Sequence, residues 1–308
     1  MQKNALRLFL SIISLLLFSH MLSGADTGGN WKRELLSWRA QRAKNLQAPQ
    51  GWLSLVGLNW LKPGDNTFGS ARDNAINLPG GPAKLGVLRL NKDAVQLLPP
   101  PGGYPKGMLA DGRAPANGQT LATDDTDHPT EIIAGTLAMV VIRRGDRLGL
   151  RTWDSRAPTL LHFHGLRWYD PNPALRVEAR WVPYNPPRQI ALATIIGTEE
   201  QVQVPGAAEF TLQGQQLRLE PVLESPGDKQ LFFILRDATS KIDTYPASRF
   251  LYTEFPDHGL TQPGTLVIDF NRAQNPPCAY TAFATCPLPP KGNVLGVSIP
   301  GGEKRYHD

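Results

Sequence analysis

Cysteine, histidine and charged side chains are all scarce in this chain of 308 residues. It has two cysteines, six histidines and 19% charged residues, against a usual charged share of about 25%. With 41% hydrophobic residues, so little charge argues against intrinsic disorder, and the chain can bury an ordinary globular core. The formal net charge of +5 is a small surplus spread along the sequence. That surplus is too small for a nucleic-acid-binding surface, so no nucleic acid is expected as a partner.

Several catalytic signatures are also missing. The sequence has no Gly-x-Ser-x-Gly elbow, no His-Glu-x-x-His motif and no Walker loop, so the hydrolases and nucleotidases that depend on them lose support. No long hydrophobic run follows residue 25, and we expect no transmembrane helix in the mature chain. No cofactor is predicted.

The first 25 residues have the pattern of a secretory signal peptide. Lys3 and Arg7 precede the apolar run Leu8–Phe18, and small residues end the segment at Ala25. This run is too short to span a bilayer but long enough for a signal sequence. We therefore expect cleavage after Ala25 and a periplasmic or secreted mature protein. The alternative is an uncleaved N-terminal anchor.

Cys278 and Cys286 lie together in a proline-rich stretch of the mature chain. In an oxidising compartment, two cysteines this close most simply form a disulfide that closes a short loop. The alternatives are a catalytic thiol, which would need a nearby base, and a zinc site, whose Cys-x2-Cys spacing is absent. A disulfide loop is therefore the prediction.

One amphipathic helix is predicted within residues 26–50. Trp31, Leu35 and Trp38 recur at helical spacing and should face a core. The other side of this helix is expected to carry the basic residues Lys32, Arg33, Arg39 and Arg42. A helix packed on the rest of the protein fits this pattern better than a helix adsorbed on a membrane.

Short apolar or alternating segments fill the remainder of the chain and are separated by turns rich in the 29 glycines and 28 prolines. Short strand-like segments separated by such turns predict a mainly β protein made of antiparallel sandwich or barrel parts. The proline-rich stretch 171–187, in which Asn185–Pro187 should be a turn, is the best boundary. It gives a first β part over residues 51–170 and a second, with the disulfide loop, over 171–308. The expected strands cover residues 52–58, 85–90, 137–142, 190–196, 210–212, 231–235, 250–252 and 266–268.

Residues 64–79 resemble the opening strands of a forkhead-associated domain. Ser70 stands where that fold places its phosphate-binding arginine. The resemblance therefore implies a sandwich for the first β part, without phosphothreonine binding.

His162 and His164 are the weak metal candidates. On a strand, alternation would point both imidazoles to one face. No third ligand follows in register, so a solvent-facing strand is the competing interpretation. No metal is predicted.

Polar side chains concentrate in the C-terminal third and define a candidate pocket. Arginines there could hold a carboxylate or sulfate, and carboxylates could move a proton. The alternative is that these side chains satisfy the backbone of proline-rich loops. A calcium loop is disfavoured because Gln274 occupies the position that requires glycine. The candidate pocket residues are Asp237, Arg249, Asp269, Asn271, Arg272 and Glu303.

Six segments carry a resemblance to a bacterial family of secreted proteins called domain of unknown function 1684. The chain departs from the family pattern at Gln274, where a tyrosine is expected, and at Ala247–Ser248, where glycines are expected. The resemblance implies an extent close to the whole mature chain and no established reaction. The segments are Gly51–Leu61, Arg249–Leu251, Asp269–Asn271, Asn275–Cys278, Thr285–Pro290 and Gly302–Lys304.

Two functions fit these observations. The first is a periplasmic or secreted protein that binds a small molecule or glycan in the C-terminal pocket, with hydrolysis as a further option. The second is a non-catalytic structural or interaction module whose partner is a component of the cell envelope. Pocket side chains gathered around open space would favour the first function, and dispersed side chains paired with backbone would favour the second.

Overall fold

The computed structural model describes residues 28–225 and 227–306, and the predicted signal peptide lies outside them. No helix in this described part of the chain is long and apolar enough to cross a membrane. The helices are α1 (Gly28–Leu46) and α2 (Pro158–Leu161). The strands are β1 (Leu55–Trp60), β2 (Gly64–Gly69), β3 (Ile76–Asn77), β4 (Gly86–Asn91), β5 (Ala94–Leu98), β6 (Leu109–Ala110), β7 (Gln119–Leu121), β8 (Ile132–Ala134), β9 (Leu137–Arg144), β10 (Arg147–Asp154), β11 (Arg176–Ala193), β12 (Glu199–Leu212), β13 (Gln215–Leu219), β14 (Gln230–Leu235), β15 (Arg249–Glu254) and β16 (Gly264–Asp269).

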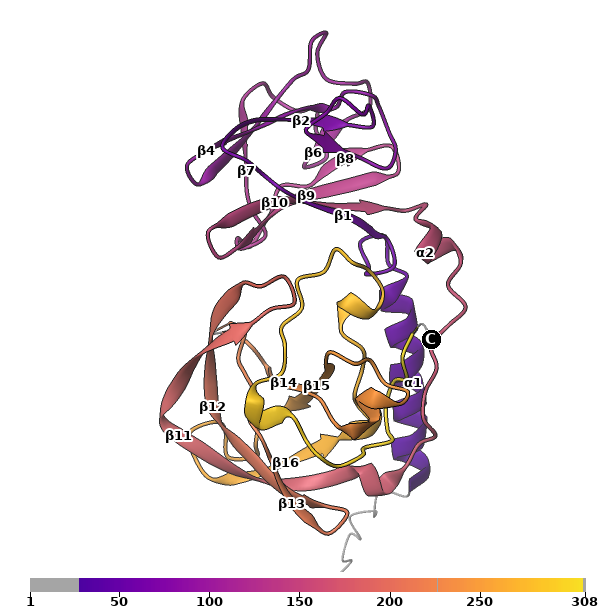
Figure 1. The fold of residues 1–308 in the computed structure, drawn as a ribbon, viewed down its shortest axis with the longest axis vertical. Coiled ribbons are helices and arrows are strands. Elements are labelled where there is room, and N and C mark those ends of the chain that lie inside the picture. Colours follow the sequence, from indigo (N-terminus) through magenta and orange to yellow (C-terminus); the bar gives the residue numbers. More distant parts are fainter. Residues whose placement is uncertain (1–27, 226, 307–308) are drawn as a thin grey trace, which may run out of the picture.

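Two five-stranded sheets form the first β part, the upper body in Figure 1. One sheet has the order β1-β10-β9-β8-β6 and the other the order β3-β2-β4-β5-β7, and only the short pair β2–β3 is parallel. Buried side chains of both sheets, including Phe68, Leu88, Met139 and Leu150, fill the space between them. Because side chains alternate along a strand, each sheet turns its other face away from this core. The first β part is therefore a sandwich.

A four-stranded antiparallel sheet, β13-β12-β11-β16, and the antiparallel pair β14–β15 form the second β part. Trp181 of β11 and Phe233 of β14 are fully buried in one apolar cluster together with Phe270. Short 3₁₀ turns and loops follow β16 and pack against these strands. The prediction of a mainly β, antiparallel protein with one helix near the N-terminus is confirmed.

One predicted turn is wrong. β11 runs straight through Asn185–Pro187, and its pairing with β12 slips between Pro183 and Arg188, which face Gly206 and Val204. Residues in such a bulge need not donate a hydrogen bond to the neighbouring strand, so prolines are tolerated there. The prolines therefore mark an irregularity within a strand and not its end.

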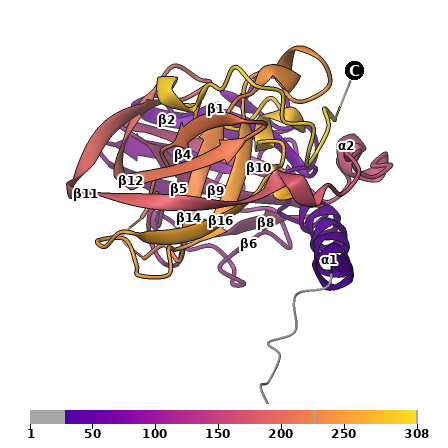
Figure 2. The same cartoon turned by 90° about the horizontal axis from the view of Figure 1, so that it is seen from below.

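Helix α1 lies alongside the second β part in both views (Figures 1 and 2). Trp31 and Leu35 are 7% and 0% exposed, as their spacing predicts. The expectation that Arg39 and Arg42 face away is wrong, since Arg39 is buried and Arg42 is partly buried. This side of the helix packs on loop ends that present carbonyl and carboxylate groups, which require donors.

The loop between Cys278 and Cys286 contacts both β parts. The two cysteines are paired in a disulfide with 6.3 Å between their Cα atoms, in agreement with the predicted loop. Thr281 Oγ1 donates a 3.0 Å hydrogen bond to the carbonyl of Leu55, which begins β1. Arg144 Nε, at the end of β9, donates to Thr285 Oγ1 at 3.3 Å. The disulfide loop therefore joins the second β part to the first.

Candidate functional site

The predicted pocket residues separate into three buried groups and one residue that reaches open space. Asp237 and Arg249 form an ion pair of 2.7 Å, and both side chains are fully buried. Arg249 also donates to the carbonyls of Ile299 and Gly301. The other Asp237 oxygen accepts hydrogen bonds from the Thr239 amide and hydroxyl and from the Ile299 amide. This pair holds two loops together.

Asp269 and Asn271 organise the turn that ends β16. Asp269 Oδ1 accepts from the amide of Asn271, and Asp269 Oδ2 accepts a 2.8 Å hydrogen bond from Trp31 Nε1 of α1. The Asn271 side chain bonds both the amide and the carbonyl of Asn172. Arg39 of α1 donates to the carbonyls of Tyr169 and Asn271. The turn is thus bonded to the helix and to the strand-connecting loop before β11.

Glu303 is the centre of a third buried polar group. Its carboxylate accepts hydrogen bonds from Arg42 Nε at 3.1 Å and from the Asn275 amide at 3.0 Å, as well as from the Tyr280 hydroxyl. Burial, and then the charge of Glu303, raises the pKa of Tyr280, so the phenol stays protonated and donates. Glu303 therefore braces the C-terminal loop against α1.

Arg272 lines a cleft next to α1, whereas Asp237 borders a different depression. This cleft lies between α1 and the ends of β14 and β15 and has a volume of ≈ 270 Å³. Arg272 is only loosely paired, with 3.9 Å between its Nε and Asp269 Oδ2, and its guanidinium lies 5.7 Å from the Trp38 ring centroid. The cleft is lined by Trp38, Gln41, Arg42, Asn45, Gln230, Tyr252, Arg272 and Gln274.

The cleft combines two guanidinium groups, four side-chain amides and two aromatic rings, with no carboxylate among the residues that line it. Arg42 is partly engaged by Glu303, whereas the Arg272 side chain is 34% exposed. Burial raises the pKa of Tyr252, and the carboxylate of Glu224 adds to the shift, so this phenol remains neutral at physiological pH. The cleft therefore presents two guanidinium groups, each with a carboxylate partner outside the lining, is rich in hydrogen-bond donors and acceptors, and is poor in groups that could transfer a proton near neutrality.

A second depression of ≈ 450 Å³ borders Asp237. The Asp237 side chain is itself fully buried and paired. The depression is lined mainly by loop residues such as Arg236, Lys241 and Pro246. It gathers no further predicted pocket side chain.

The metal candidates do not lie on a strand. His162 follows the short helix α2, and both His162 and His164 are exposed, so the predicted alternation of a strand is wrong here. Pro158 starts a helical turn and Gly165 has a φ of 97°, which together end extended structure in this segment. Among the residues that the structure describes, no three His, Cys, Asp or Glu side chains are grouped to hold a metal ion.

Sequence reasoning missed most of the cleft. Trp38, Arg42 and Asn45 recur at helical spacing on one side of α1, and this polar stripe is the signal that could have found them. Gln230 belongs to β14 and Tyr252 to its antiparallel partner β15, and no local sequence pattern identifies either residue as part of a site. Only the packing of the helix on that pair brings the two sets together.

Comparison with known proteins finds a solved structure and a family model that each match part of the chain. No curated protein matches the chain. A solution NMR structure of an uncharacterized protein from Haloarcula marismortui is 29% identical, with a TM-score of 0.41, and the similarity covers 47% of this chain and 79% of that one. The family model described as "Protein of unknown function (DUF1684)" matches residues 161–304, a range that contains the second β part and the disulfide loop. From residue 161 to 304, the chain is thus similar to a family of proteins of unknown function.

Proposed function

We propose that the protein binds a small, negatively charged, sugar-sized molecule in the cleft between α1 and the β14–β15 pair, outside the cytoplasm. The observation that carries this proposal is the set of side chains lining the cleft: Arg42 and Arg272 without a lining carboxylate, beside four amides and two aromatic rings. The Arg272 guanidinium is only loosely paired, at 3.9 Å from Asp269 Oδ2, and a guanidinium can recognise a further carboxylate through two parallel hydrogen bonds.

A sugar acid fits the other lining groups. Side-chain amides both donate and accept, as sugar hydroxyls require. The rings of Trp38 and Tyr252 offer flat surfaces of the kind that pack against the apolar face of a sugar ring. A volume of ≈ 270 Å³ is at the small end of ligand pockets, which suits one or two sugar units better than a long chain. Binding is better supported than hydrolysis because the lining contains no acid–base pair.

The experiment is a titration of the mature protein with glucuronate and with glucose, followed by calorimetry. We expect glucuronate to bind at least tenfold more tightly than glucose, because only the acid can pair with Arg272. Arg272→Gln should weaken glucuronate binding at least tenfold, which corresponds to about 1.4 kcal/mol.

Arg33→Gln is the matched control, since Arg33 is an exposed arginine of the same helix whose hydrogen bond goes to Asn30. That variant should bind glucuronate as the unmodified protein does. Equal affinity for glucose and glucuronate, or an Arg272→Gln variant that binds normally, would refute an acid-recognising cleft.

The second candidate function is a non-catalytic structural or interaction module of the cell envelope. One observation favours it. Most of the predicted pocket residues are buried, and their polar atoms bond to loop backbone, to α1 or to one another; these residues are Asp237, Arg249, Asp269, Asn271 and Glu303. Under this alternative, a thermal-shift screen of sugars and organic acids leaves the melting temperature unchanged, because no native-state ligand exists.

A further inference from the structure

The outer face of the β1–β10–β9 sheet is covered by the second β part. Val140 and Ile142 of β9 lie on this face and are 7% and 0% exposed. The disulfide loop reaches the same face through its contacts with Leu55 and Arg144, and Figure 1 shows the C-terminal chain approaching the sheet from below. We call this covered face the seam.

One arginine in the seam has no partner. Arg151 of β10 is 8% exposed, and its guanidinium lies 5.8 Å from the ring centroid of Trp52 and 5.9 Å from that of Trp153. Its Nε finds no acceptor, and no carboxylate among the described residues forms an ion pair with it. A buried cation without a hydrogen-bond acceptor is unfavourable, because its desolvation is only partly offset.

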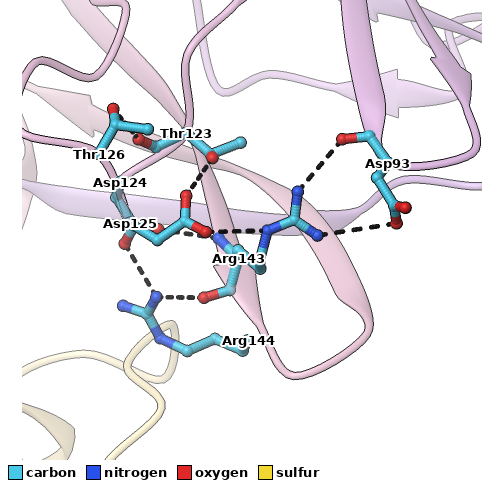
Figure 3. Close-up of polar contacts among 7 residues, drawn as sticks. All are labelled: Asp93, Thr123, Asp124, Asp125, Thr126, Arg143 and Arg144. Atoms are coloured by element: carbon cyan, nitrogen blue, oxygen red, sulfur yellow. Dashed lines mark hydrogen bonds and ion pairs between the residues drawn. The ribbon is translucent and has the colours of Figure 1, made fainter.

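The Nε of Arg39 and of Arg249 also has no acceptor, but the other buried arginines of the described chain differ from Arg151 because their guanidinium groups do bond acceptors. Arg249 has Asp237 and two carbonyls, Arg42 has Glu303, and Arg39 has two carbonyls. Arg144, the cation nearest in sequence on the neighbouring strand, pairs with Asp124 at 2.9 Å and with Thr285, and Figure 3 shows Arg143 beside it held by Asp93 and Asp125. Each of these arginines therefore has a hydrogen-bond acceptor, whereas Arg151 has none among the described residues.

A second donor without a partner lies on the same strand face. Trp153 is two residues from Arg151, so both side chains point to the seam. The indole Nε1 of Trp153 is buried and has no acceptor. Burial, and then the charge of Arg144, lowers the pKa of Arg151 to about 10 against the opposing effect of the Asp124 carboxylate, and Arg151 is still charged at neutral pH. The seam thus has one positive charge and two unused donors, the Arg151 Nε and the Trp153 Nε1, on the same face of β10.

We propose that the seam is a binding site for a small oxyanion, a carboxylate or phosphate group, held by the Arg151 guanidinium and the Trp153 indole N–H between the two β parts. An anion supplies the acceptor that Arg151 lacks and adds a countercharge to that of Asp124, which is already paired with Arg144. The site shares no residue with the α1 cleft, so this proposal does not depend on the function proposed above.

The test is a titration of the mature protein with inorganic phosphate and, separately, with sodium acetate, each at constant ionic strength set with sodium chloride. Tryptophan fluorescence reports binding because Trp52 and Trp153 flank Arg151. We expect a saturable change with at least one of the two anions, and a rise in melting temperature over the same concentration range. Phosphate and acetate as separate titrants distinguish the two sources of the oxyanion.

Three variants make the result specific. Arg151→Met should weaken anion binding at least tenfold, the loss expected for a charge-assisted hydrogen bond, and Trp153→Phe should weaken it while keeping an aromatic ring. Arg147→Met is the matched control, because Arg147 belongs to the same strand face but is exposed and stacks on Trp60 at 4.0 Å. It should bind as the unmodified protein does.

The proposal is overturned if neither anion gives a saturable response, since the donors are then met by water alone. It is also overturned if Arg151→Met and Arg147→Met respond equally, which would indicate a general salt effect. A seam variant that fails to fold is recognised by its circular dichroism, and Trp153→Phe then decides the outcome.

Discussion

At the scale of single residues, the partners of each buried charge determine what that charge does. Arg249 and Asp237 are both fully buried and neutralise each other, whereas Arg151 is buried beside two tryptophan rings and has no ion pair among the described residues. A paired buried charge becomes costly when its partner is removed, while an unpaired one is costly already. The two arginines should therefore respond in opposite ways to the same substitution.

We predict that Arg249→Met lowers the free energy of unfolding by about 3–5 kcal/mol, because Asp237 is then left buried and unpaired. Arg151→Met should leave stability unchanged or raise it in buffer without phosphate or carboxylate. Urea unfolding of the two variants side by side measures both effects. Equal losses of stability would show that Arg151 has a partner in the folded protein and would remove the basis of the seam site.

At the scale of secondary structure, α1 is the element in which the predicted exposure of side chains differs from the structure, at Arg39 and Arg42. The spacing of Trp31 and Leu35 predicts both the helix and its buried side, and the structure agrees. The same periodicity assigns Arg39 and Arg42 to solvent, because hydrophobic patterning treats every arginine as exposed. Their acceptors, the Asn271 carbonyl and Glu303, are more than 200 residues away in sequence, so no local pattern could reveal them.

Strands show the same limit. The runs around residues 231–235 and 250–252 correspond to β14 and β15, since alternation and turn residues are local signals. β11 was missed as a continuous strand because its prolines are compatible with a bulge that only the pairing with β12 defines. Of the candidate site, the sequence pointed to Arg272, and the cleft around it depends on tertiary packing that periodicity does not encode.

Helix α1 should contribute to stability mainly through its buried side. Leu35→Ala is predicted to cost about 2–5 kcal/mol, because Leu35 is fully buried and its removal leaves a cavity. Leu36→Ala is the neighbouring control, and as Leu36 is 48% exposed it should change stability by about 0.5 kcal/mol or less. Thermal unfolding of both variants distinguishes them, and similar effects would contradict the packing of α1 described above.

At the scale of the whole molecule, two β parts are joined through β1, the hairpin β9–β10 and the disulfide loop. Thr281 and Thr285 of this loop contact the first β part, while Cys278 and Cys286 hold it against the second. Loosening the loop should therefore affect the junction before it affects either core.

We predict that both cysteines are oxidised in protein isolated from an oxidising compartment. Mass spectrometry without reductant should find a linked peptide pair and no alkylated thiol. Replacing both cysteines by serine should lower the free energy of unfolding by somewhat less than 3 kcal/mol, the value for a loop of about 15 residues. Two alkylatable thiols in freshly isolated protein would show that the loop is held by packing alone.

The central claim, that the α1 cleft binds an acidic sugar, is tested most directly by NMR of the indole N–H groups of the seven tryptophans. Trp38 lines the cleft, so addition of glucuronate should shift its indole resonance in a saturable way, while glucose at the same concentration should not. The resonance of Trp181, whose indole is fully buried and donates to the Leu260 carbonyl, should stay in place at concentrations of glucuronate that saturate the cleft. An unshifted Trp38 resonance at millimolar glucuronate, or a shift equally produced by glucose, would contradict the account.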